Sequence, residues 1–227
     1  RVIHTALKNN VIFAVTSVIC QIGVSLVIAA LLESKFMRRW QSVFYTIYFI
    51  PSLLMITVTG ITFKMLYSPT IGLLNPVLAK LGIDVSNIAI LADAETAIWG
   101  VAAMSQWQFI GYTVVLFIVS MQSISDDIYE AAAIDGATGI QRFFLITAPI
   151  MINMIIVITG AFRVYDEVYV MTGGGPGTST QTLATYLYQI GFKNDQMGYA
   201  SAIAFFVFII TFILGLFQMK GYDLSDD

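Results

Sequence analysis

The segment that decides the fold is residues 97–121, which reads AIWGVAAMSQWQFIGYTVVLFIVSM and contains no charged residue. An α-helix rises about 1.5 Å per residue, so about 20 apolar residues cross a hydrocarbon core of roughly 30 Å. Apolar residues occupy every face of this predicted helix, which is typical of a membrane span and not of an amphipathic surface helix. We therefore predict a transmembrane helix over 97–121.

Four further segments have the same character and the required length, at about residues 11–32, 43–65, 143–164 and 199–219. Pro51 is expected to kink the second of these helices, because proline lacks the N–H that a helix interior needs. The predicted fold is an all-α polytopic membrane protein: a single transmembrane domain over 1–227 with five transmembrane helices.

The overall composition agrees with a membrane protein and excludes several function classes. The chain is 58% hydrophobic and only 11% charged, against about 25% charged in soluble domains. A net charge of −3 favours no nucleic-acid partner, and a single cysteine and a single histidine argue against a disulfide or a metal site. The glycine-rich run 173–178 lacks the Gly-Lys-Ser/Thr ending of a phosphate-binding loop. We find no catalytic arrangement and predict that the chain is not an enzyme.

Three basic residues between the first two predicted helices set the expected orientation. Lys35, Arg38 and Arg39 place that short loop in the cytoplasm by the positive-inside rule. Alternation then puts the loop 122–142 and the C-terminus in the cytoplasm, with 66–96 and 165–198 outside.

The predicted cytoplasmic loop 122–142 has the signature of an ordered short helix. Ser125 can cap its start, Asp126 and Asp127 suit the positive end of the helix dipole, and three alanines favour helix. Gly136 can end the helix as a left-handed residue. Such a helix could dock in a groove of a partner protein. The alternative is a solvated acidic turn that only joins two spans.

At this loop the sequence resembles a known family. The loop is similar to the EAA loop of ABC importer permeases, because it contains the pattern Glu130-Ala131-Ala132, three residues, Gly136, nine residues, Ile146, one residue, Ala148-Pro149. Ala148 stands where that family usually has Leu. The stretch 72–76 resembles the external loop of that family. The stretches 168–177 and 198–202 resemble its carbohydrate-uptake branch, which includes permeases of maltose and glycerol-phosphate importers.

The resemblance implies both partners and a location for the chain. In that family the loop couples to an ATPase, so Glu130, Ala131, Ala132 and Gly136 are the expected contact residues. The expected partners are a second permease subunit, an ABC ATPase dimer that holds ATP and Mg²⁺, and an external solute-binding protein. No cofactor is expected on this chain. The resemblance further implies a bacterial or archaeal cytoplasmic membrane, and a further helix before Arg1.

Polar and aromatic residues within the spans are the candidates for contact with a solute, because polar groups are costly in lipid. Resemblance to maltose-type permeases assigns Ser105, Gln108, Phe109 and Tyr112 to this role. The alternative is hydrogen bonding and packing between helices, which also applies to Asn153.

In similar permeases the outer part of the fourth predicted helix also lines the site, and this resemblance makes Phe162, Arg163 and Asp166 further candidates. The alternatives are that Arg163 and Asp166 pair with each other or that Arg163 reaches the membrane interface.

The function predicted from these features is that of a permease subunit of an ATP-driven importer. Its solute would be a sugar, an oligosaccharide or a related polyol. An amino-acid or peptide permease of the same class and a stand-alone facilitator or channel remain as alternatives. No carboxylate lies deep within a predicted span, which favours a neutral solute and an external energy source.

Overall fold

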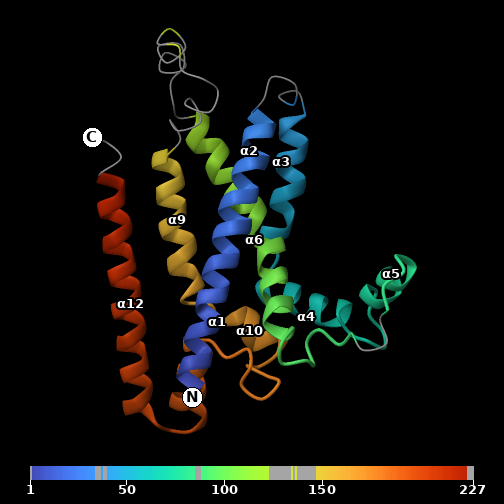
Figure 1. Ribbon diagram of the computed structural model, residues 1–227, viewed down its shortest axis with the longest axis vertical. Helices are drawn as coiled ribbons and strands as arrows, with labels where there is room; N and C mark the ends of the chain where they lie inside the picture. Colours follow the sequence, from blue (N-terminus) through green and yellow to red (C-terminus); the bar gives the residue numbers. More distant parts are fainter. Residues whose placement is uncertain are drawn as a thin grey trace.

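The computed structural model describes residues 2–33, 37, 40–84, 88–122, 134, 136 and 147–223, and every regular element in this part of the chain is helical. The longer helices run side by side along the long axis of the molecule (Figure 1). Shorter helices gather at the end where the chain begins. The expected all-α fold is confirmed.

The first helix is continuous from Val2 to Glu33 and therefore begins well before the predicted start at residue 11. It consists of α1 (Val2–Ser17), a π-helical segment η1 (Val18–Val24) and α2 (Ser25–Glu33). A π-helical segment widens the turn and changes which residues face a neighbour. This segment lies in the middle of the bundle, where the helix passes α6 and α9.

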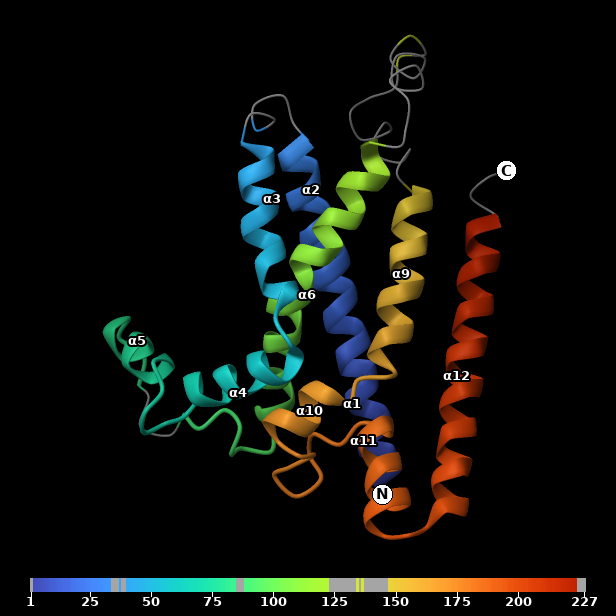
Figure 2. The same cartoon turned by 180° about the vertical axis from the view of Figure 1, so that it is seen from behind.

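The second predicted helix, 43–65, is not one straight span. It divides into α3 (Gln41–Phe49) with a 3₁₀ turn η2 (Ile50–Leu53), and α4 (Ile56–Leu66), at an angle of 92°. Pro51 lies in the 3₁₀ turn, and Leu54 is extended with a ψ of 142°. The kink expected at Pro51 is thus a complete change of direction. Figure 2 shows α4 running sideways from the lower end of α3 toward α5 (Leu74–Lys80), away from the other long helices.

Helix α6 (Ala97–Gln122) lies at the centre and packs against the first helix, α3 and α9. Gly111 lies near the middle of α6, and a Cβ atom at this position would overlap the carbonyl group of Tyr48. This glycine allows α3 to approach the backbone of α6 directly, as small residues do in membrane helix packing.

The remaining elements are α9 (Thr147–Ala161), α10 (Asp166–Met171), α11 (Leu183–Tyr188), a second π-helical segment η4 (Gln189–Lys193) and α12 (Met197–Asp223). Among the described residues, three helices are long and apolar enough to cross a membrane: Val2–Glu33, Ala97–Gln122 and Met197–Gln218. The bent pair adds a fourth candidate, and α9 is a shorter apolar helix. Residues 143–146, where the fourth predicted helix begins, lie outside the described part.

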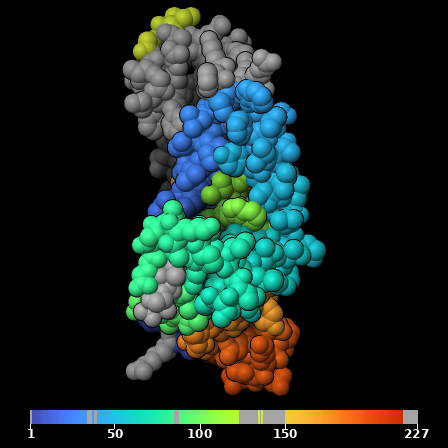
Figure 3. All heavy atoms as spheres, turned by 90° about the vertical axis from the view of Figure 1, so that its right-hand side faces the viewer, coloured from blue at the N-terminus to red at the C-terminus, as the bar shows by residue number. Residues whose placement is uncertain are grey.

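The outer surface is strongly apolar, as expected if lipid surrounds it. Large side chains on α12 such as Phe205, Phe208 and Phe217 are exposed, and so are Ile47 and Leu53 on the bent pair. Figure 3 shows that α2, α3 and the α4–α5 arm cover one face, with α6 visible between them. Exposed apolar surface on this scale is unusual for a soluble monomer.

The segment 172–182 is fastened to α1 by buried polar contacts, which we call the anchor network (Asn9, Asn10, Ser179, Gln181, Thr182, Leu183). The Asn9 amide donates to the carbonyl oxygens of Ser179 at 2.7 Å and of Gln181 at 2.8 Å. Asn10 donates to the Ala161 carbonyl at 2.7 Å and accepts from the Leu183 backbone N–H at 2.9 Å. The Thr182 hydroxyl donates to the Val164 carbonyl at 2.7 Å. These contacts hold the middle of α1 against the end of α9 and the start of α11.

Candidate solute site

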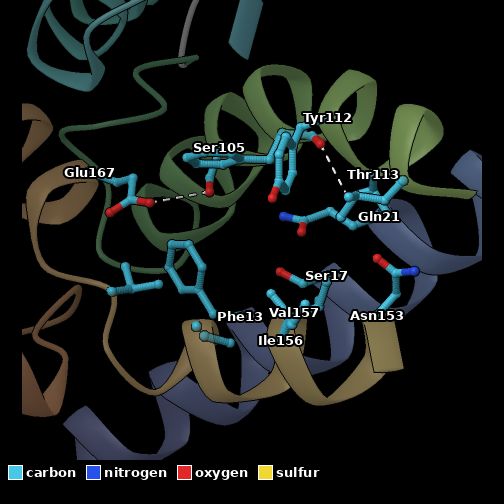
Figure 4. Close-up of a pocket in the computed structure, with 15 residues that line it drawn as sticks. Phe13, Ser17, Gln21, Ser105, Tyr112, Thr113, Asn153, Ile156, Val157 and Glu167 are labelled. Atoms are coloured by element: carbon cyan, nitrogen blue, oxygen red, sulfur yellow. Dashed lines mark hydrogen bonds between the residues drawn. The ribbon is translucent and has the colours of Figure 1, made fainter. Parts of the chain in front are cut away.

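A cavity of about 260 Å³ lies between the first helix, α6, α9 and α10 (Figure 4). Its lining combines amides, hydroxyls and a carboxylate with apolar and aromatic side chains. The lining residues are Phe13, Ser17, Gln21, Ser105, Phe109, Tyr112, Thr113, Leu116, Asn153, Ile156, Val157, Gly160, Ala161, Val164 and Glu167.

Each wall of the cavity follows from a local feature of its helix. The π-helical segment starts just after Ser17 and includes Gln21, and these two polar residues of the first helix both face the cavity. On α6 the spacing from Ser105 to Phe109 and Tyr112 places the three side chains along one face. Gly160 and Ala161 leave room on the α9 side, where larger side chains would fill the space.

A polar contact behind the lining joins the first helix to α6. The Gln106 amide nitrogen donates at 3.2 Å to the hydroxyl of Ser17, which lines the cavity, whereas Gln106 itself is not a lining residue. The Gln106 carbonyl oxygen is buried and accepts no hydrogen bond from the described residues, which costs free energy.

Glu167 closes the end of the cavity next to α10. Its side chain is 7% exposed, and the Ser105 hydroxyl donates to its Oε1 at 3.5 Å, marked by a dashed line in Figure 4. Burial raises the pKa of the Glu167 carboxyl, and the neighbouring Asp166 charge raises it further. Hydrogen bonds from its own backbone and from Ser105 act in the opposite direction but do not cancel the effect.

Three of the residues predicted on α6 line this cavity, namely Ser105, Phe109 and Tyr112. Gln108 does not. It is 2% exposed, and its amide nitrogen donates at 2.8 Å to the carbonyl of Leu54, at the break between α3 and α4. Gln108 therefore fits the alternative prediction, hydrogen bonding between helices. Its amide supplies a partner for a carbonyl group at the bend, where the helix is interrupted.

The three residues predicted beyond α9 lie away from the cavity lining. Phe162 is buried in a separate cluster with Ala6 and Leu183. Arg163 and Asp166 are exposed, since their positions before and at the start of α10 point outward. The register of this segment brings Val164 and Glu167 to the cavity instead.

The sequence analysis missed Phe13, Ser17, Gln21 and Glu167, and gave Asn153 mainly a packing role. Polar residues in the first apolar span were a usable signal, because Ser17 and Gln21 are as costly in lipid as those on α6. Glu167 was not identifiable as buried, because it lies beyond the predicted span in a run that also contains exposed charges.

The residues expected to contact an ATPase lie mostly outside the described part of the chain: Glu130, Ala131 and Ala132 all do. Gly136 is described and has a φ of +76°. The prediction that it adopts a left-handed conformation is confirmed, and this conformation is strained for residues with a side chain.

The geometry is that of a polytopic helical protein with a polar cavity among its spans, and comparison with known proteins gives its class. A family described as "Binding-protein-dependent transport system inner membrane component" matches residues 21–219. The chain belongs to this family, so it is a membrane-integral permease of the ABC importer class, as the sequence predicted.

Two relatives show the extent of the similarity. The chain is 46% identical over 226 residues to the probable ABC transporter permease protein YurN of Bacillus subtilis, covering 97% of this chain and 77% of the relative. It is 31% identical over 224 residues to the arabinooligosaccharides transport system permease protein AraP of the same species, covering 96% and 71%.

Among solved structures, a bacterial ABC transporter involved in the import of the acidic polysaccharide alginate has the same fold. One of its chains superposes with a TM-score of 0.85 at 19% identity, covering 98% of this chain and 79% of that one.

Proposed function

We propose that the chain forms part of the translocation path of an ATP-driven importer for a sugar, an oligosaccharide or a related polyol, and that the solute passes through the cavity between α1, α6, α9 and α10. The cavity lining carries the proposal. Hydroxyls and amides match sugar hydroxyls, while the Phe109 and Tyr112 rings can cover the apolar face of a sugar ring. The AraP relative is named for oligosaccharide transport, which supports the same solute class.

The size of the cavity favours a short part of a saccharide at a time. At about 260 Å³ it is slightly smaller than typical small-molecule sites, which begin near about 300 Å³. A longer chain would therefore be held by one sugar unit, or the cavity would widen as the helices move.

The energy source in this proposal is a partner ATPase that binds ATP and Mg²⁺ and docks on the loop around Glu130 and Gly136. Closure of the ATPase dimer would rock α6 and α9, which flank both that loop and the cavity, and exchange access between the two sides. An external binding protein would deliver the solute, and a second permease subunit would complete the path. The basic residues Lys35, Arg38 and Arg39 support a cytoplasmic position for the docking side by the positive-inside rule.

The test is to purify the full-length chain with its partners and measure ATP-dependent uptake in proteoliposomes. Neutral sugars should compete for uptake and amino acids should not. The double variant Glu130→Ala, Gly136→Leu should lose the copurifying ATPase and the uptake, while Glu95→Gln, an exposed change elsewhere, should keep both. If amino acids compete and sugars do not, the solute is an amino acid or peptide and not a sugar. Uptake that needs neither ATP nor an ATPase would favour a stand-alone facilitator.

A further inference from the structure

Among the residues that the structure describes, Glu167 is the one lining residue with a carboxyl group. Within the same described part of the chain, no lysine, arginine or histidine lines the cavity. The exposed Arg163 lies outside the lining although it is only four residues away in sequence. A solute in the cavity therefore meets one acidic group and no counter-charge.

Two physical consequences follow for a saccharide beside Glu167. A carboxylate accepts hydrogen bonds from two neighbouring sugar hydroxyls, which favours a neutral polyol, and it attracts an ammonium group. An acidic sugar would instead bring a second carboxylate into a poorly hydrated space, where like charges repel strongly and neither is neutralised by a cation.

We propose that Glu167 determines the charge selectivity of the cavity: it admits neutral and amino sugars and excludes uronic acids. This inference rests on the proposed function and specifies its solute class. The fold does not dictate the result, since a solved transporter with the same fold is involved in the import of acidic alginate. The selectivity instead comes from the one charged side chain in the lining.

The position of Glu167 suits this role. Its Oε1 accepts the hydrogen bond from Ser105, and Glu167 comes from α10, while the other lining residues except Val164 come from the first helix, α6 and α9 (Figure 4). The side chain is buried and lines the cavity, so the carboxyl group lies beside any solute that occupies this end of it.

The experiment measures sugar binding directly on the purified permease–ATPase complex without the binding protein, which would impose its own selectivity. Equilibrium dialysis uses matched sets of a neutral sugar, its amine and its acid: glucose, glucosamine and glucuronate, and galactose, galactosamine and galacturonate. The wild type is expected to bind the neutral or amino sugar at least about tenfold more tightly than the acid.

Two variants test the residue itself. Glu167→Gln should reduce this preference to within about threefold, and Glu167→Met, of similar length, should do the same through loss of charge. Glu95→Gln removes an exposed carboxylate and should leave the preference unchanged. Elution of each variant with its ATPase on size exclusion verifies folding.

The outcomes separate this inference from the proposed function. Equal binding of neutral sugar and acid by the wild type, or full discrimination retained in both Glu167 variants, would overturn the role of Glu167 while the sugar permease stands. Binding of none of the six sugars, with binding of amino acids instead, would overturn the proposed function and this inference with it.

Discussion

The first helix places polar residues in two opposite situations. In the middle of α1, Asn9 and Asn10 make four hydrogen bonds in the anchor network, each with a backbone partner 2.7–2.9 Å away. Further along the helix, Ser17 at the end of α1 and Gln21 in η1 face the cavity.

The difference separates structural from functional polar groups in one helix. The paired side chains of Asn9 and Asn10 hold the fold, because breaking their hydrogen bonds leaves buried backbone groups unsatisfied. A set of polar groups with open capacity beside a cavity can pair with a passing solute instead. Changes at the anchor network should therefore affect stability, and changes at the cavity should affect uptake.

The largest effect is expected from Asn10→Leu. The change leaves the Ala161 carbonyl and the Leu183 N–H buried without partners, at a cost of about 4 kcal/mol in unfolding free energy. Thermal unfolding in detergent should show a clear loss of stability, whereas Ser201→Ala on the exposed face of α12 should not. A stable Asn10→Leu protein with impaired uptake would show that Asn10 serves solute transport and not stability.

A second change tests whether Gln108 belongs with the structural group. Gln108→Leu removes the donor to the Leu54 carbonyl at the bend, and about 2 kcal/mol of stability should be lost with it. Sugar affinity of the protein that remains folded should stay within about twofold of the wild type. A stable variant with strongly weakened sugar binding would place Gln108 in the path after all.

The opposite pattern is expected from Gln21→Met in the cavity. Gln21 is not part of the anchor network, so the free energy of unfolding should change by less than about 0.5 kcal/mol. Loss of one or two hydrogen bonds to the solute should weaken the apparent affinity for uptake about tenfold. Unchanged uptake kinetics would exclude Gln21 from the solute path.

The smallest effect concerns the pH dependence of stability. Because burial raises the folded-state pKa of Glu167 above its usual 4.5, the protonated form favours the native state. This contribution is fully present below pH 4.5 and is lost as the pH rises through the raised pKa. Wild-type stability should thus fall over that range relative to Glu167→Gln, measured by thermal unfolding at each pH. Parallel curves for the two proteins would show that Glu167 does not titrate in this way.

Much of the fold was predictable because apolar length is a local property. The helix expected over 97–121 is found at Ala97–Gln122, and that expected over 199–219 is found within α12. Gly136 was expected to be left-handed because of its place after a helix-forming run, and it is. The spacing on α6 likewise placed Ser105, Phe109 and Tyr112 on one face.

What the sequence determined by itself was the class of protein, the main helices and the shared face of α6, because each depends on composition and spacing along one segment. Only the tertiary structure decided that the helix turns by 92° after Pro51, that Gln108 pairs with the carbonyl freed there, and that Glu167 is buried at the cavity. These properties depend on which groups from distant segments lie beside a residue. Burial and hydrogen-bond pairing are determined by those neighbours, and not by the residue's own position in the chain.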